Sequence, residues 1–244
     1  MSYSTTPQAI GRTSLISTTV FLAGLSLAFA DLQKVDNVAQ ENLTNAARAA
    51  VATLEKVGQP ISDDDRIRLF ATFEKPGSQA IGMVQEVLDR YCLLGIRINE
   101  EGWLSTTVAS NNLADHQLVQ GKWKYFLIKI NNESAVKAPL AARSPQELWP
   151  EELKNAEAGA DVTSADANGW YRWMGLQTYD PPLTSDSPGP TVRYLVLGIF
   201  GRDQGMRAAN LEFYFNGGAV SQGHYTSQRL LFDVVPAAQA AAKK

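Results

Sequence analysis

The chain has 244 residues, of which 45% are apolar and 9% aromatic, and its acidic side chains exceed the basic ones to leave a net charge of −3. This composition excludes a disordered or collagen-like chain and predicts a folded protein with an apolar core. Charged residues make up only 19% and form no basic block, so nucleic acid is not expected as a partner.

Few residues are suited to metal, disulfide or catalytic chemistry. Cys92 is the single cysteine, which excludes an internal disulfide and a cysteine-rich metal site. His116 and His224 are far apart in sequence and lack the spacing that places two imidazoles on one helix face. The sequence has no G-x-S-x-G motif and no phosphate-binding glycine loop, and His224 has only Ser221 and Ser227 near it. We therefore expect no enzyme, no metal and no cofactor.

An uncharged segment of 18 residues runs from Thr13 to Ala30 and predicts a membrane-directed helix. Arg12 precedes it and Asp31 follows it, which favours an N-terminus in the cytoplasm and a body on the periplasmic or outer face of the membrane. The side chains expected in the membrane are Leu15, Ile16, Val20, Phe21, Leu22, Leu25, Leu27 and Phe29.

The segment 1–30 has two interpretations, which the sequence leaves open. Ala28-Phe29-Ala30 fits the small-x-small pattern of a signal-peptide cleavage site. An uncleaved anchor is the alternative, since 18 helical residues span roughly 27 Å, enough for a thin hydrocarbon core. In the second case the membrane itself is a partner of the protein.

Residues 31–90 are expected to form two or three helices. From Asp31 to Val57, apolar residues recur every three or four positions, which predicts one amphipathic helix that ends at Gly58 and Pro60. The members of this stripe are Val35, Ala39, Leu43, Ala46, Ala50, Leu54 and Val57.

Two further helices follow in the pattern. Ser62 precedes three aspartates at 63–65, which indicates a helix N-cap and an acidic first turn rather than a calcium loop. A third helix is predicted from Gln79 to about Arg90, after the break at Pro76 and Gly77.

Residues 91–236 change to the two-residue alternation typical of β-strands. The run 123–130 is apolar on nearly every position, which predicts a central strand, and 209–215 alternates with its odd-numbered positions facing inward. Gly201 to Gly205 is interpreted as a hairpin turn. The predicted strands cover residues 94–98, 123–130, 170–178, 192–200, 209–215 and 230–234, with 103–109 as a weaker candidate. The sequence thus predicts a mainly β protein, an antiparallel immunoglobulin-like β-sandwich preceded by helices.

The segment 144–169 shows no clear period and carries many acidic side chains against Lys154 alone. It is interpreted either as a solvated insertion or as a partner-binding loop, in which Trp149 is the apolar anchor beside Glu151 and Glu152. Residues 237–244 are expected to be a flexible tail.

Trp170, Tyr171 and Trp173 lie close together at the start of a predicted strand. Strand alternation places Trp170 with Arg172 on one face and Tyr171 with Trp173 on the other. One face would fill the core, and the other would offer a platform for a protein partner or a glycan. Trp170 and Trp173 are therefore candidate contact residues.

A further set of segments, within roughly residues 85–234, is 88–93, 96–99, 126–133, 138–140, 173–180, 194–200, 202–205, 207–209 and 218–232. Together these segments resemble a module of uncharacterised exported bacterial proteins, which in some proteins precedes a metallohydrolase domain of the polymerase-and-histidinol-phosphatase type. The resemblance implies a β-sandwich and an exported setting. The chain departs from the pattern at 100–103, at Ser221 and at Tyr225, and it has no metallohydrolase domain.

These patterns together predict a noncatalytic, periplasm-facing interaction or scaffold protein. An accessory subunit of a respiratory or photosynthetic membrane complex fits the anchor interpretation, and other protein subunits are the expected partners. The alternative is a carbohydrate- or envelope-binding module that uses an exposed tryptophan.

Overall fold

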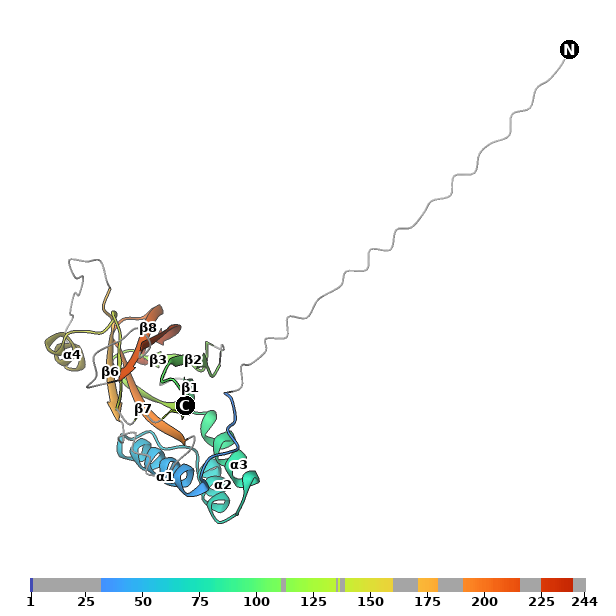
Figure 1. Cartoon of the computed structure of the whole chain (residues 1–244). Helices are drawn as coiled ribbons and strands as arrows, with labels where there is room; N and C mark the ends of the chain where they lie inside the picture. Colours follow the sequence, from blue (N-terminus) through green and yellow to red (C-terminus); the bar gives the residue numbers. More distant parts are fainter. Residues whose placement is uncertain are drawn as a thin grey trace.

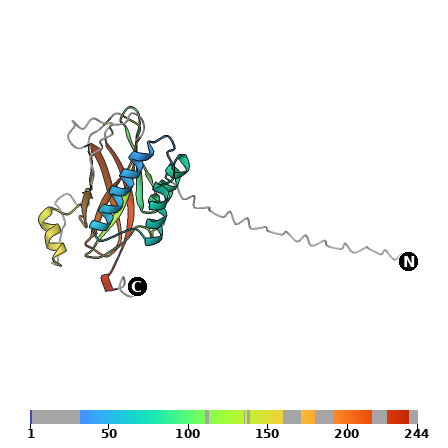
Figure 2. The same ribbon diagram turned by 90° about the horizontal axis from the view of Figure 1, so that it is seen from below.

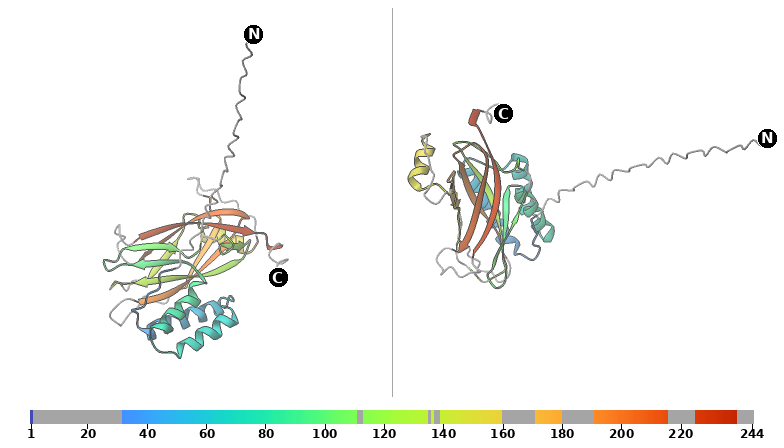
Figure 3. Two further views of the ribbon diagram at one scale, coloured as in Figure 1. Left: turned by 90° about the vertical axis from the view of Figure 1, so that its right-hand side faces the viewer. Right: turned by 90° about the horizontal axis from the view of Figure 1, so that it is seen from above.

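The computed structural model describes Met1 and residues 32–110, 113–134, 136, 139–159, 171–179, 191–215 and 225–238. Within these ranges the chain forms two β-sheets and four helices, and three of the helices cover one face of the larger sheet (Figures 1 and 3). The predicted mainly β fold with N-terminal helices is confirmed at this level.

The described elements follow one another in an order of helices first and strands afterwards, with one helix inserted late. The helices are α1 (Gln40–Lys56), α2 (Asp63–Phe73), α3 (Ser78–Asp89) and α4 (Pro150–Glu157). The strands are β1 (Cys92–Ile98), β2 (Leu104–Val108), β3 (Gln117–Val119), β4 (Trp123–Asn132), β5 (Leu140–Arg143), β6 (Met174–Tyr179), β7 (Thr191–Gly201), β8 (Gly205–Phe215) and β9 (Tyr225–Val235).

The larger sheet, called sheet A, has the strand order β2-β1-β4-β7-β6, and sheet B has the order β3-β9-β8-β5. The run predicted as a central strand is β4, which lies between β1 and β7. The predicted antiparallel sandwich is wrong in one respect, because β1 pairs with β4 and β3 pairs with β9 in parallel. Both sheets are therefore mixed. Local alternation does not encode strand direction, since a parallel strand buries its side chains with the same period.

The two sheets pack face to face around one apolar core. Phe213 and Phe232 of sheet B and Ile128 of sheet A are fully buried in it. The odd-numbered positions of β8 from Ala209 to Phe215 all face this core, as the alternation predicts. The second face of sheet A is covered by α1, α2 and α3, so β4 and β7 are buried on both sides (Figure 2).

Residues 32–38, called the strap, are not helical in the structure, and the helix predicted from Asp31 begins only at Gln40. Gln85 of α3, which is fully buried, accepts a hydrogen bond from the Val35 amide at 3.0 Å and donates one to the Val35 carbonyl at 2.9 Å. Leu32, Val35 and Val38 are buried at a spacing of three. An irregular segment that packs against a helix can bury every third residue, as an amphipathic helix does, so periodicity alone could not place the helix start.

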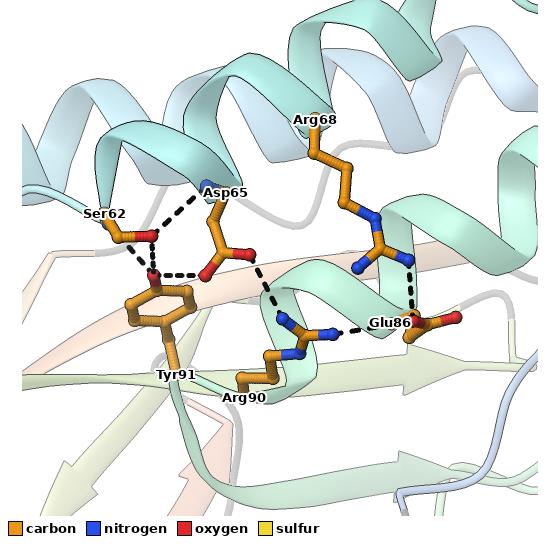
Figure 4. A network of polar contacts seen from close by, with 6 residues as sticks. All are labelled: Ser62, Asp65, Arg68, Glu86, Arg90 and Tyr91. Carbon is orange, nitrogen blue, oxygen red and sulfur yellow. Dashed lines mark hydrogen bonds and ion pairs between the residues drawn. The ribbon is translucent and has the colours of Figure 1, made fainter.

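The predicted N-cap of α2 is confirmed, because the Ser62 hydroxyl accepts a hydrogen bond from the Asp65 amide at 3.2 Å. The Asp65 carboxylate accepts hydrogen bonds from the Tyr91 hydroxyl at 2.7 Å and from Arg90 at 3.2 Å, and Arg90 also pairs with Glu86 of α3 (Figure 4). The acidic first turn thus joins α2 to the end of α3.

The segment Gly201–Gly205 is not the hairpin turn that the sequence predicts. The strand before it, β7, belongs to sheet A, whereas β8 belongs to sheet B, so the turn carries the chain from one sheet to the other. The Arg202 amide donates to the Trp173 carbonyl at 2.8 Å and thereby ties this corner to the start of β6. A turn signal between two strands does not specify whether they share a sheet.

The acidic segment 144–169 contains a helix, contrary to the expectation of an irregular loop. This helix, α4, begins with Pro150, and the Glu152 side chain accepts a hydrogen bond from the Trp149 amide at 2.8 Å. It contacts the body through Ala156 and Leu153, which pack near Trp123 and Phe200, and through Glu157, which accepts a hydrogen bond from the Trp123 indole at 2.7 Å. A helix this short, with few apolar residues, shows no helical periodicity of apolar residues in the sequence, and this is why the segment was predicted to be irregular.

Gly198 of β7 has no room for a side chain, because a Cβ there would lie 2.7 Å from Tyr125 Cε1 and 3.2 Å from Trp123 Cε3. We expect Gly198→Ala to lower the free energy of unfolding by about 1–3 kcal/mol, since overpacking forces the neighbouring rings to move. Gly82→Ala in α3, where nothing lies within 4 Å, is the matched control and should raise stability by about 0.5–1 kcal/mol. Urea unfolding measures both, and equal stabilities of the two variants would contradict the prediction.

Candidate interaction surface

Trp149 lies on the surface, immediately before α4, with 59% of its area exposed. The Arg172 guanidinium stacks on its ring, with Cζ at 4.1 Å from the ring centroid. Arg172 precedes β6, and the backbone of Glu147 forms a bridge with Met174 of that strand. This bridge holds the segment before α4 against the edge of sheet A, and so it brings Trp149 and Arg172 together.

Tyr171, next to Arg172, is 46% exposed and lies among charged groups of the β7–β8 corner. Its hydroxyl donates to Asp203 at 2.6 Å, and the guanidinium groups of Arg202 and Arg207 lie 5.7 and 5.3 Å from its ring centroid. Partial burial raises the pKa of the Tyr171 hydroxyl, and its bond to Asp203 acts in the same direction. The tyrosine is therefore neutral at physiological pH.

Asp203 makes this arrangement rigid, because its carboxylate binds Arg202 through two hydrogen bonds, at 3.0 and 2.7 Å. A bidentate arginine–carboxylate pair fixes both position and orientation. We call the whole patch the Trp149–Tyr171 surface. It consists of Trp149, Tyr171, Arg172, Arg202, Asp203 and Arg207.

Only some of the contact residues predicted from the sequence lie at this surface. Trp149 is exposed as expected, and Glu151 lies beside it on the exposed first turn of α4. Glu152 caps α4 through the Trp149 amide. Trp173 is 1% exposed, packs on Phe232 and donates its indole N–H to the Ala208 carbonyl at 3.0 Å, so it is a core residue.

The predicted alternation of Tyr171 with Trp173 on one face is also wrong, because β6 begins only at Met174 and the two side chains diverge before it. Trp170 lies outside the described residues. Tyr171, Arg172, Arg202 and Arg207 were missed as contact residues. An arginine next to an aromatic residue, as at Tyr171 and Arg172, can be recognised in the sequence. Only the folded corner between the two sheets brings this segment to Arg202 and Arg207.

The residues expected in the membrane, from Leu15 to Phe29, also lie outside the described ranges. Among the helices that the structure does describe, none combines the length and the apolar content of a membrane span.

A buried polar cluster between α3 and sheet A is the other chemically notable place. The ammonium group of Lys129, with its side chain 3% exposed, lies 2.8 Å from the Asp89 carboxylate, which also accepts a hydrogen bond from the Tyr194 hydroxyl at 3.3 Å. Burial raises the pKa of Asp89, and Lys129 opposes that rise. The three groups satisfy one another, which is the arrangement of a structural ion pair.

Cys92 lies at the same cluster and lines a cleft of about 360 Å³ together with Lys34, Glu86 and Asp89. Burial raises the pKa of its thiol well above the ordinary value, and the nearby Asp89 charge acts in the same direction. A thiol held in its protonated form is a poor nucleophile. In the described parts of the chain, histidine, cysteine and acidic side chains form no group of three that would bind a metal ion.

Comparison of the chain with protein-family models and with curated proteins found no match in either.

The buried ion pair leads to a stability prediction. Lys129→Leu should lower the free energy of unfolding by about 3–5 kcal/mol, because it leaves the Asp89 carboxylate buried without its partner. The double variant Lys129→Leu with Asp89→Leu should recover at least half of that loss, since it removes both charges. Chemical denaturation of both variants measures the difference. A double variant no more stable than the single one would contradict this explanation.

Proposed function

We propose that this chain is a noncatalytic interaction or scaffold protein that binds another protein through the Trp149–Tyr171 surface. The observation that carries the proposal is the gathering of an exposed tryptophan, an exposed tyrosine and three arginines from three segments at one edge of sheet A. Tryptophan, tyrosine and arginine are the residues that most often dominate the free energy of protein–protein binding.

The rigidity of the surface supports the same proposal. Arg172 already lies on the Trp149 ring, and Asp203 already holds Arg202 and the Tyr171 hydroxyl. A partner would therefore bind side chains whose rotamers are fixed, and the entropy cost of ordering them would be small. A polar rim is present as well, since Glu151 lies beside the tryptophan.

The cellular setting is part of the proposal and rests on the sequence. The segment 1–30 directs the chain to the membrane, so the folded body would face the periplasm, and the partner would be a subunit of a respiratory or photosynthetic complex. We also propose that the sandwich is immunoglobulin-like and that the chain is related to the exported bacterial modules that it resembles.

The interaction is tested by pull-down from solubilised membranes with Trp149→Ala as the central variant. Loss of a contact residue of this type costs about 2 kcal/mol or more, which is about a thirtyfold loss of partner affinity. Trp103→Ala is the matched control, because Trp103 is 55% exposed and precedes β2, at the opposite edge of sheet A. Its partner affinity should stay within about twofold of the wild type.

Two results would overturn this assignment. Recovery of the lone protein at native expression would argue against any stable partner, and equal losses in the two tryptophan variants would argue against this particular surface. A saturable change in tryptophan fluorescence on titration with an envelope polysaccharide, abolished by Trp149→Ala, would instead favour the carbohydrate-binding alternative.

The role of the N-terminal segment is tested separately by the intact mass of the native protein. A mass that retains the residues before Thr13 would show an uncleaved anchor and would favour a subunit of a membrane complex. A mature N-terminus at Asp31 would show a cleaved signal peptide and would leave only a soluble or peripheral scaffold role.

A further inference from the structure

His116 is a buried histidine immediately before β3. The residue is 6% exposed, and its ring packs against Phe232 of β9 with the two ring centroids 5.8 Å apart. Its Nδ1 lies 3.2 Å from the carbonyl oxygen of Leu231. Because a carbonyl can only accept a hydrogen bond, Nδ1 carries the proton of the neutral ring and Nε2 is left as an acceptor. Nε2 is buried as well, and it has no hydrogen-bond partner among the described residues.

A second proton on this ring is unfavourable while the ring is buried. Protonation of Nε2 would create a charge inside the protein, together with an N–H donor that no acceptor in the described parts of the chain receives. A buried charge of this kind is costly unless it is paired. Burial accordingly lowers the pKa of His116, while the Leu231 carbonyl and the Asp115 carboxylate oppose that change.

A second cation already holds the segment that carries His116. Lys124 of β4 donates from Nζ to the carbonyl of Asp115 at 3.1 Å and to the carbonyl of Gln117 at 2.9 Å. The ammonium group is thus bound to the backbone on both sides of the histidine. Its charge opposes an imidazolium at this place, whereas the Asp115 carboxylate favours one.

The short strand β3 is the element that could respond to a charge on His116. It has three residues, Gln117–Val119, lies at the edge of sheet B and pairs in parallel with the end of β9. The charged residues of β9 are Asp233, which accepts a hydrogen bond from Gln117 at 3.1 Å, and Arg229, which is exposed. An edge strand of this length opens at a low cost in free energy, and its opening would give Nε2 access to water.

We propose that His116 is a pH-sensitive latch, whose neutral ring keeps β3 paired with β9 and whose protonation in mild acid releases β3. One proton passes reversibly from solvent to Nε2, and water solvates the imidazolium once the strand is open. The latch goes beyond the proposed binding function and does not depend on the Trp149–Tyr171 surface.

The pH at which the latch opens follows from the direction in which burial changes the pKa. With β3 open, His116 has its ordinary pKa of about 6.5, and with β3 closed its pKa is lower. Between these two values the open form binds more protons than the closed form. The pairing of β3 with β9 is therefore fully stable above the ordinary pKa, and it weakens as the pH falls below that value.

Hydrogen exchange of the full-length protein in detergent micelles, at about pH 7.5 and about pH 5, tests the latch. Exchange is compared as protection factors, which correct for the effect of pH on the chemical exchange rate. Amides of residues 117–120 should lose protection severalfold in acid, by no more than about tenfold per pH unit, the limit for one proton. Among them is the Gln120 amide, which donates to the Val235 carbonyl at 2.9 Å. Amides of α1 should keep their protection.

His116→Gln removes the titratable group, so the protection of β3 should become the same at the two pH values. His224→Gln is the matched control, because His224 is the other histidine of the chain and its loss should leave the pH dependence unchanged. This control also tests the latch where His116→Gln does not fold. It leaves one imidazole signal in the proton spectrum, which should titrate at a lower pH in the folded protein than in urea.

Three results would overturn the latch: equal protection of β3 at both pH values, a pH dependence that persists in His116→Gln, or an imidazole signal that titrates at the same pH in the folded and the unfolded protein. Equal losses of protection in β3 and in α1 would overturn it too, because acid would then unfold the whole body rather than release one strand.

Discussion

The burial of sheet A on both faces is the constraint on which the rest of the structure depends. Sheet B covers one face and α1, α2 and α3 cover the other, so β4 and β7 have almost no contact with water. Every polar group on the helix-covered face must then find a partner inside the protein. Lys129 is compatible with this position because Asp89 reaches it from the end of α3, and Gly198 leaves space for Tyr125 on the neighbouring strand.

The same constraint explains why the candidate interaction surface lies at the margin of sheet A. The Trp149–Tyr171 surface forms where β6 begins and where β7 turns into sheet B, and it combines segments that are distant in sequence. The strap depends on the packing of the helices, because Gln85 of α3 fixes its backbone at Val35 through two hydrogen bonds.

The candidate surface could be predicted from the sequence only in part. Trp149 was predicted as an exposed anchor because it stands in an acidic, aperiodic segment, and the structure exposes it. Trp173 was predicted as a possible contact because it follows Trp170 in a strand-like run, yet its indole fills the core. Composition identifies residues that can bind partners. Whether a ring faces solvent depends on where the strand begins, because a shift of one residue turns every side chain of the strand to the opposite face.

The sequence by itself determined the properties that depend on neighbouring residues: the N-cap at Ser62, the helix end at Gly58, the inward face of β8 and the burial of β4 on both sides. Only the tertiary structure decided which strands pair in parallel, that β7 and β8 belong to different sheets, and that His116 is buried against β9. The physical reason is the separation in sequence of the residues that interact. Caps, turns and alternation are set by contacts within a few residues, whereas strand pairing and the satisfaction of a buried polar group require segments that are far apart in the chain.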